Sequence, residues 1–183
     1  MTASNPERSN SPLPRGAPLL ITAELPEDVL SWADAIRRAN YPPERNRLRA
    51  HVTLFHGLPP SADSEVRALL AEFSRRAAPE ATVSGLMDLG QGTAFAIDSP
   101  AMVALHAELA ERLHGLVQQK DARPLRLHIT VQNKVGRREA RALQQELARD
   151  MRARDFRFRG LGLYLWQEEL GRLSHVYPFR GQG

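Results

Sequence analysis

The sequence predicts a single mixed domain of strands and helices that is built from two similar halves. Strand-like and helix-like segments alternate along the chain, which by itself favours a parallel sheet. The element Leu-Arg-x-His-x-Thr occurs at residues 48–53 and again at 125–130, which indicates an internal duplication. Hydrophobic residues make up 42% of the 183 residues, enough for a sizeable core. We expect this domain at residues 17–183, with halves at about 17–89 and 90–183.

The first half reads as strand, helix, strand, helix, strand. Residues 18–25 are typical of a buried strand, and residues 26–40 of a helix that a proline opens. A second strand is expected at residues 48–58. The helix that follows carries on one face Val66, Leu69, Leu70 and Phe73. Residues 82–88 predict the last strand of this half.

The second half repeats this order and adds a closing strand. Its strands are expected at residues 93–98, 125–133, 156–166 and 173–179. Its helices are expected to begin at Ser99-Pro100 and after Gly136. The last two strands are expected to form a hairpin across residues 168–171.

The composition excludes several classes of protein. The chain contains no cysteine, so it has no disulfide, no catalytic thiolate and no cysteine-ligated metal. No apolar stretch is long enough to span a bilayer, and residues 1–16 lack the apolar core of a signal peptide. We therefore expect residues 1–16 to be a disordered leader and the protein to be soluble and cytoplasmic.

The net charge is +4, and nearly all basic residues are arginine, since only Lys120 and Lys134 are lysines. Arginine binds phosphate through a planar fork, so this bias suits a phosphate-bearing partner. Arginine-rich codon usage from a GC-rich genome explains the same bias and is the favoured cause. The charge alone therefore does not indicate a nucleic-acid-binding protein.

The duplicated element is the strongest functional signal in the sequence. Side chains of a strand alternate between its two faces. One face of the first strand is therefore expected to carry Arg49, His51, Thr53 and Phe55. The same face of the second strand is expected to carry Arg126, His128, Thr130 and Gln132. The opposite faces are apolar, so each strand would pack on one side and present functional groups on the other.

Two histidines from equivalent strands can supply an acid and a base near neutral pH. Cleavage of a cyclic phosphodiester needs this pair, because one imidazole deprotonates the attacking water and the other protonates the departing sugar oxygen. The threonines can donate to the phosphate oxygens, where charge accumulates. Two histidines without a carboxylate or cysteine partner are a poor zinc site, so we expect neither metal nor cofactor. The predicted catalytic residues are His51, Thr53, His128 and Thr130.

These motifs resemble those of the 2H phosphoesterase superfamily, which includes the bacterial 2′-5′ RNA ligase-like, RNA 2′,3′-cyclic phosphodiesterases. The family signature is a pair of His-x-[Ser/Thr]-hydrophobic motifs, matched here by His51-Val52-Thr53-Leu54 and His128-Ile129-Thr130-Val131. The resemblance covers about residues 17–181. It implies an α+β fold that is bilobal and pseudo-twofold, with two largely antiparallel sheets forming a central cleft and helices on the outside.

The resemblance also implies a reaction, the hydrolysis of a 2′,3′-cyclic phosphate to a 2′-phosphomonoester. The partner is then RNA with such an end or a small cyclic nucleotide, and we expect a monomer. One alternative is 2′-5′ RNA ligation, or phosphodiesterase action on another small cyclic phosphate. Another is a non-catalytic RNA-binding module, although binding alone would not need two titratable imidazoles.

Five further residues are predicted to bind substrate, namely Arg49, Phe55, Arg126, Gln132 and Lys134. The two arginines flank the catalytic histidines and could contact phosphate or form salt bridges, and phosphate contact is favoured. The phenylalanine could stack on a base. In many RNA-directed members an arginine follows the second threonine, whereas this chain continues Gln132-Asn133-Lys134. That phosphate contact is therefore either supplied by Lys134 or absent.

The remaining histidines are mostly predicted to be structural or solvent-exposed. His56 is expected on the strand face opposite His51, and His106 and His114 do not have metal-ligand spacing. His175 lies on a strand face that is either core or lines the cleft. A solvated face, with the intervening phenylalanines turned inward, is expected to carry Arg152, Arg154, Arg157 and Arg159.

Overall fold

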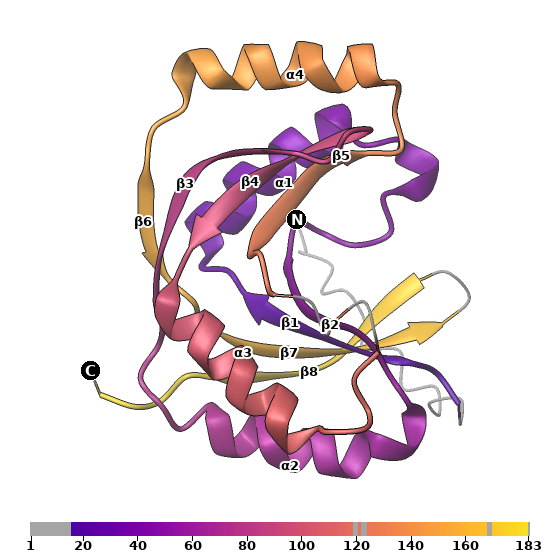
Figure 1. The fold of residues 1–183 in the computed structure, drawn as a ribbon, viewed down its shortest axis with the longest axis vertical. Helices are drawn as coiled ribbons and strands as arrows, with labels where there is room; N and C mark the ends of the chain where they lie inside the picture. Colours follow the sequence, from indigo (N-terminus) through magenta and orange to yellow (C-terminus); the bar gives the residue numbers. More distant parts are fainter. Residues whose placement is uncertain (1–15, 119–120, 122–123, 168–169, 183) are drawn as a thin grey trace, which may run out of the picture.

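Two antiparallel sheets with helices on their outer faces make up the computed structural model, which describes residues 16–118, 121, 124–167 and 170–182 (Figure 1). Apart from Gly16, the expected leader lies outside the described residues, as do residues 168–169 of the expected last hairpin. One apolar core runs through both sheets. None of the described helices is long and apolar enough to cross a membrane.

The first sheet carries the first His-x-Thr motif at its edge. Its strand order is β2-β1-β7-β8, and every neighbouring pair is antiparallel. The strands are β1 (Leu19–Glu24), β2 (Val52–Leu58), β7 (Gly160–Gln167) and β8 (Leu170–Pro178). β2 therefore begins later than the expected residue 48, directly after His51.

The second sheet has the equivalent order β5-β4-β3-β6, also with antiparallel neighbours, and places the second motif at its edge. The strands are β3 (Glu80–Asp88), β4 (Gly92–Asp98), β5 (His128–Asn133) and β6 (Arg154–Arg157). In both sheets the edge strand that carries the motif pairs with the strand that precedes it in the chain, as an internal duplication predicts.

The helices explain why the sheets are antiparallel although strands and helices alternate. α1 (Glu27–Asn40) connects β1 to β2 but packs against β5 of the other sheet. α3 (Pro100–Arg112) connects β4 to β5, yet its His106 stacks on Phe55 of β2. A parallel crossover would need each helix on the sheet of its own strands. The α+β fold is thus confirmed, and the parallel sheet favoured by simple alternation is wrong.

The other helices cover the outer faces of the sheets (Figure 1). α2 (Asp63–Phe73) lies beside α3, and the ion pairs Arg112–Glu72 and Arg76–Glu108 join the two helices. α4 (Arg137–Asp150) covers β3 and β4 of the second sheet. Two short 3-10 turns lie at Pro43–Arg45 and Pro60–Ala62.

The expected strand at residues 156–166 is divided between the two sheets. β6 ends at Arg157, and the chain passes through the buried Phe158 before β7 begins at Gly160. A Cβ atom at Gly160 would lie 2.5 Å from the carbonyl oxygen of Tyr177, so only glycine allows this close approach. This crossing places β7 and β8, from the second predicted half, beside β1 and β2 in the first sheet.

Candidate active site

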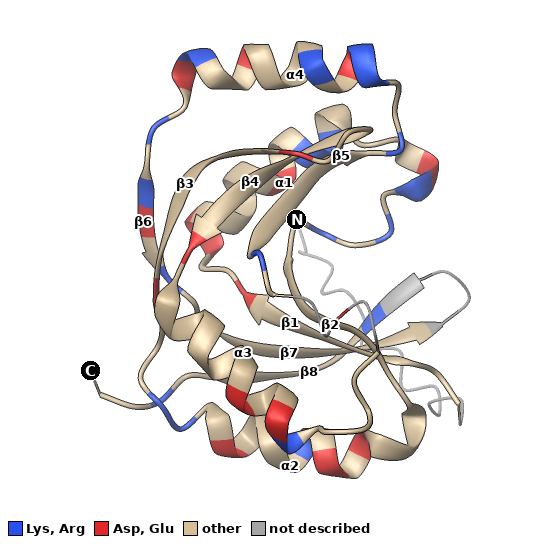
Figure 2. Ribbon diagram, in the orientation of Figure 1, with Lys and Arg blue, Asp and Glu red and all other residues tan. Residues whose placement is uncertain are grey.

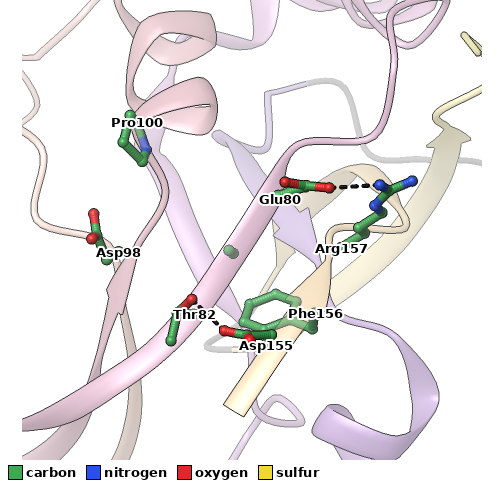
Figure 3. Close-up of a pocket in the computed structure, with 8 residues that line it drawn as sticks. Glu80, Thr82, Asp98, Pro100, Asp155, Phe156 and Arg157 are labelled. Atoms are coloured by element: carbon green, nitrogen blue, oxygen red, sulfur yellow. Dashed lines mark hydrogen bonds and ion pairs between the residues drawn. The ribbon is translucent and has the colours of Figure 1, made fainter. Parts of the chain in front are cut away.

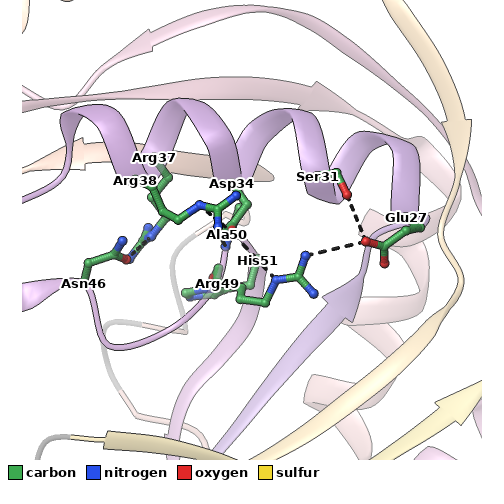
Figure 4. Close-up of polar contacts among 9 residues, drawn as sticks. All are labelled: Glu27, Ser31, Asp34, Arg37, Arg38, Asn46, Arg49, Ala50 and His51. Carbon is green, nitrogen blue, oxygen red and sulfur yellow. Dashed lines mark hydrogen bonds and ion pairs between the residues drawn. The ribbon is translucent and has the colours of Figure 1, made fainter. Parts of the chain in front are cut away.

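The first motif is held in place by α1. The Ala50 N–H donates a hydrogen bond of 2.9 Å to Oδ1 of the buried Asp34, which fixes the backbone just before His51 (Figure 4). Nδ1 of His51 lies 2.7 Å from the carbonyl oxygen of Arg49. A carbonyl oxygen can only accept, so Nδ1 carries a hydrogen and Nε2 is left free for chemistry.

The second motif repeats this arrangement. Nδ1 of His128 lies 2.7 Å from the carbonyl oxygen of Arg126, so this ring also keeps Nε2 free. Thr53 and Thr130 are partly exposed. The intervening apolar positions, Val52, Leu54, Ile129 and Val131, are at most 1% exposed. Each motif therefore has the expected buried face and functional face.

Arg37 connects the two motifs. It lies in the last turn of α1, and its Nη1 donates to the Thr130 carbonyl oxygen at 2.6 Å. The same Arg37 lines a cleft with His51 and Thr53. β2 contacts β5, and the charge of His128 is close enough to lower the pKa of His51. The structure thus brings the four predicted catalytic residues to one place, and sequence reasoning missed Arg37.

The cleft beside the first motif has a volume of about 950 Å³ and an excess of positive charge. Its charged residues are Arg37, Arg45, Arg47, Lys134 and Glu44. Figure 2 shows the basic positions of the loop that follows α1. Tyr41 and Trp166, the latter 41% exposed, add aromatic surface. This combination can hold a phosphate and a flat ring together.

A β-bulge in β2 turns Phe55 away from the cleft. Adjacent residues of β1 pair with Thr53 and Phe55, which leaves Leu54 as an extra residue and reverses the alternation beyond it. Phe55 is 0% exposed, and its ring stacks on His106 with a centroid separation of 4.5 Å. The prediction that Phe55 stacks on a base is therefore wrong.

We expect Phe55→Ala to lower the free energy of unfolding by about 3–5 kcal/mol, because it removes a fully buried ring. Urea denaturation of the variant and of Phe55→Leu would measure this, with a smaller loss expected for leucine. Unchanged stability would contradict the core position of Phe55.

An equivalent bulge in β5 turns Gln132 inward. Adjacent residues of β4 pair with Thr130 and Gln132, so Val131 is the extra residue. Gln132 is 2% exposed, and its Oε1 accepts a hydrogen bond from Thr93 at 3.4 Å. The prediction that Gln132 binds substrate is wrong for the same reason as that for Phe55. Bulges beside active sites often redirect side chains in this way.

The bulge in β2 also brings His56 into the cleft, so the prediction that it lies opposite His51 is wrong. His56 lines the cleft together with His51 and Thr53. Its backbone N–H donates to Asp121 Oδ2 at 2.9 Å, and its Nδ1 lies 2.6 Å from Asp121 Oδ1. The Asp121 side chain is 2% exposed. A buried carboxylate therefore fixes the orientation of the His56 ring.

The remaining predicted substrate-binding residues take different positions. Arg49 forms ion pairs of 3.6 Å with Glu27 and Asp34 and does not line the cleft, which favours the salt-bridge alternative (Figure 4). Arg126 is exposed and also lies outside the lining of the cleft. Lys134 is exposed and does line the cleft, with a backbone φ of +58°.

The environment of His51 holds its ring in the neutral form. Burial lowers the pKa of His51 from its ordinary 6.5 to about 4, although the bond to the Arg49 carbonyl opposes this decrease. The positive charges of Arg37, His56 and His128 lower the pKa further. Near neutral pH, His51 is therefore an unprotonated imidazole with a free Nε2, which suits a general base.

An NMR titration should show the His51 imidazole protonating with a midpoint near pH 4. In His56→Gln the midpoint should rise, because one of the positive charges that oppose protonation is gone. His175→Gln is the control, since His175 is exposed on β8 and is not among the groups that affect His51. A wild-type midpoint near 6.5 would contradict this description.

The other histidines and the arginine run lie outside the cleft. His106 is buried, His114 is exposed, and His175 is exposed with an edge contact to Tyr177. His175 is therefore neither core nor part of the cleft. Phe156 and Phe158 point inward, as expected. In the predicted arginine run, Arg152, Arg157 and Arg159 are exposed. The guanidinium of Arg154 lies over the ring of Trp32, with its Cζ 4.7 Å from the ring centroid.

A second hollow, of about 610 Å³, is lined by residues of β3 and β6 together with Asp98 and Pro100 (Figure 3). Its polar groups largely pair with one another, since Glu80 forms an ion pair with Arg157 and Thr82 donates to Asp155. None of the predicted site residues lines it. Within the described part of the chain, no group of three or more His, Cys, Asp or Glu side chains could hold a metal ion.

A family model for the 2′-5′ RNA ligase superfamily matches residues 25–172, which include both His-x-Thr motifs. The chain belongs to this superfamily. No curated protein matches it. The match supports the expected relationship to the 2H phosphoesterases and makes a phosphoesterase or ligase the general class of this enzyme.

Several solved structures share the fold of this chain. TT0787 of Thermus thermophilus has a TM-score of 0.62 at 15% identity, covering 91% of this chain and 100% of that one. LigT of E. coli, complexed with NADP+, has a TM-score of 0.57 at 15% identity, covering 90% and 99%. A protein described as a phosphoesterase has a TM-score of 0.57 at 18% identity, covering 90% and 98%. At these identities the likeness shows the fold alone.

Proposed function

We propose that this superfamily member hydrolyses the 2′,3′-cyclic phosphate of RNA ends or nucleotides to a 2′-phosphomonoester. The observation that carries the proposal is the matched pair of histidines. Each ring uses Nδ1 to donate to the carbonyl oxygen two residues earlier, at 2.7 Å, and keeps Nε2 free. Two such rings at one site are an acid and a base of fixed orientation.

In the proposed reaction His51 is the base and His128 is the acid. Nε2 of His51 accepts a proton from water as the water oxygen bonds to phosphorus. The bond from phosphorus to O3′ breaks, and O3′ takes a proton from Nε2 of His128. The assignment follows from the low pKa of His51, which leaves its ring unprotonated at neutral pH.

Thr53 and Thr130 are proposed to stabilise the charge that builds on the phosphate oxygens. Both hydroxyls lie two residues beyond a catalytic histidine on the same strand face, and both are partly exposed. Donors that point to a developing negative charge commonly lower the barrier by several kcal/mol, about 3–4 for one donor.

The surroundings of the motifs support a nucleotide substrate. The cleft is basic and has the aromatic side chains of Tyr41 and Trp166 in its wall. LigT of E. coli has been solved in complexes with NADP+ and with ATP. By analogy, we propose that the cleft holds the nucleotide that carries the cyclic phosphate.

The test is turnover of 2′,3′-cyclic AMP and of an RNA oligonucleotide with the same end, followed by phosphorus NMR of the product. We expect a 2′-phosphomonoester, and the rate should be unchanged by EDTA. Failure to open any 2′,3′-cyclic phosphate would refute the proposal. Predominant formation of the 3′-phosphate would refute the assignment of O3′ as leaving group.

A second candidate is 2′-5′ ligation, after which the superfamily is named. In that reaction the 5′-hydroxyl of another RNA replaces water as the nucleophile, and the same two imidazoles act as base and acid. Supplying an RNA with a 5′-hydroxyl end beside the cyclic phosphate distinguishes the two, because ligation yields a longer RNA whose junction is a 2′-5′ bond.

A further inference from the structure

Arg37 combines burial with access to the active-site cleft. It is only 5% exposed, yet it lines the cleft with His51. Its Nε donates to Oδ1 of Asn46 at 2.8 Å (Figure 4). Its Nη1 donates to the Thr130 carbonyl oxygen at 2.6 Å. The ring of Tyr41 lies against the guanidinium, with its centroid 4.0 Å from Cζ. None of these partners carries a negative charge.

No carboxylate in the described part of the chain forms an ion pair with Arg37. Asp34, one turn earlier on α1, is the carboxylate whose negative charge acts on Arg37, where it opposes the decrease in pKa that burial causes. The oxygens of Asp34 are already engaged, by the Ala50 N–H and by ion pairs with Arg38 and Arg49. A buried cation that no carboxylate contacts is costly, and an anionic ligand bound beside it would offset that cost.

The position of Arg37 indicates which anion this is. Its side chain touches the backbone of the second motif at Thr130. Among neighbouring charges, that of Arg37 has the largest effect on the pKa of His51 in the first motif. The guanidinium therefore lies between the two motifs, which is where the reacting phosphate must lie if both imidazoles are to reach it.

We propose that Arg37 binds the reacting phosphate of the substrate, a role that rests on the proposed cyclic phosphodiesterase function. The guanidinium has five N–H donors, so its hydrogen bonds to Asn46, to Thr130 and to the Tyr41 side chain leave others available to phosphate oxygens. α1 thereby supplies the arginine that the sequence after Thr130 lacks, from a helix distant in the sequence. Lys134 is exposed at the rim of the same cleft and is less constrained.

Arg37 could instead serve only to join α1 to β5, and the experiment must separate the two roles. We would measure the affinity of inorganic phosphate and of 2′-AMP by calorimetry for the wild type, Arg37→Gln, Arg37→Lys and Arg38→Gln. Arg38 is the matched control, since it is the next residue of α1 but has a 69% exposed side chain paired with Asp34. The melting temperature of every variant would be recorded.

We expect Arg37→Gln to lower the affinity for both ligands by about 10- to 100-fold, which is the usual effect of losing a charge-assisted hydrogen bond. Arg38→Gln should bind both ligands as the wild type does. Should the glutamine variant fail to fold, Arg37→Lys provides the test: it keeps the charge but loses the planar fork, so several-fold weaker binding is expected. Wild-type affinity in whichever Arg37 variant folds, or no phosphate binding by the wild type, would overturn the inference.

Turnover of 2′,3′-cyclic AMP by the same variants, measured beside the calorimetry, separates this inference from the proposed reaction. If the wild type opens no cyclic phosphate but binds phosphate in an Arg37-dependent way, the reaction is refuted and the anion site stands. If the wild type turns over the cyclic nucleotide and Arg37→Gln retains its kcat/KM, the reaction stands and the role of Arg37 is refuted.

Discussion

Replacing either His51 or His128 by alanine is expected to lower kcat for 2′,3′-cyclic AMP by about 1,000-fold or more. Each substitution removes one of the two free Nε2 atoms, and the reaction needs both a base for water and an acid for O3′. The double variant should be little slower than either single one, because residues that act in one step are not additive. Steady-state kinetics on the purified variants would measure these losses.

Both substitutions should leave the fold intact, since each histidine is partly exposed and its ring donates to the carbonyl oxygen two residues earlier. Circular dichroism and the melting temperature would check this. His114→Ala is the matched control, because His114 is exposed and lies outside the cleft lining. Full activity in either His51→Ala or His128→Ala would refute two-histidine catalysis.

Replacing Thr53 or Thr130 by valine is expected to lower kcat by about 100- to 1,000-fold, because valine keeps the shape of threonine but loses the hydroxyl donor. Serine at either position keeps the hydroxyl and should retain most of the activity. Thr82→Val is the control, since Thr82 donates to Asp155 of β6 and does not line the cleft. Equal activities of the serine and valine variants would show that the hydroxyls do not contact the phosphate.

The positions of the proposed catalytic residues could be predicted from the sequence because the signal is local and repeated. His51 and His128 stand in the same six-residue element, and strand alternation correctly put each histidine and threonine on one face. The antiparallel pairing of the strands was predicted from the family resemblance alone. Alternation of helices and strands carries no information about which sheet a helix covers, so α1 and α3 could not be placed from it.

Phe55, His56 and Gln132, which follow the threonines, were predicted on the wrong strand faces. Strict alternation of side chains does not allow for the extra residue of a bulge. In β2 the adjacent apolar pair Leu54-Phe55 breaks the alternating pattern, and this break is a usable signal for the bulge that exposes His56. In β5 the polar Gln132 offers no such signal. Only the register of the folded sheet shows that it is buried.

Arg37 escaped prediction for a different reason. It stands next to Arg38 near the end of a helix, where two adjacent arginines resemble a solvated face. Its burial depends on α1 packing against β5, and that contact joins residues 93 positions apart in the sequence. No local pattern encodes such a contact.

The central claim, that His51 is the base and His128 the acid on one phosphate, is tested most directly with a cyclic nucleotide that has sulfur in place of O3′. A thiolate leaves without protonation, so this substrate needs a base but no acid. We predict that the large loss in His128→Ala mostly disappears with the sulfur substrate, whereas the loss in His51→Ala persists. Equal losses with both substrates in both variants would contradict the assignment of the two histidines.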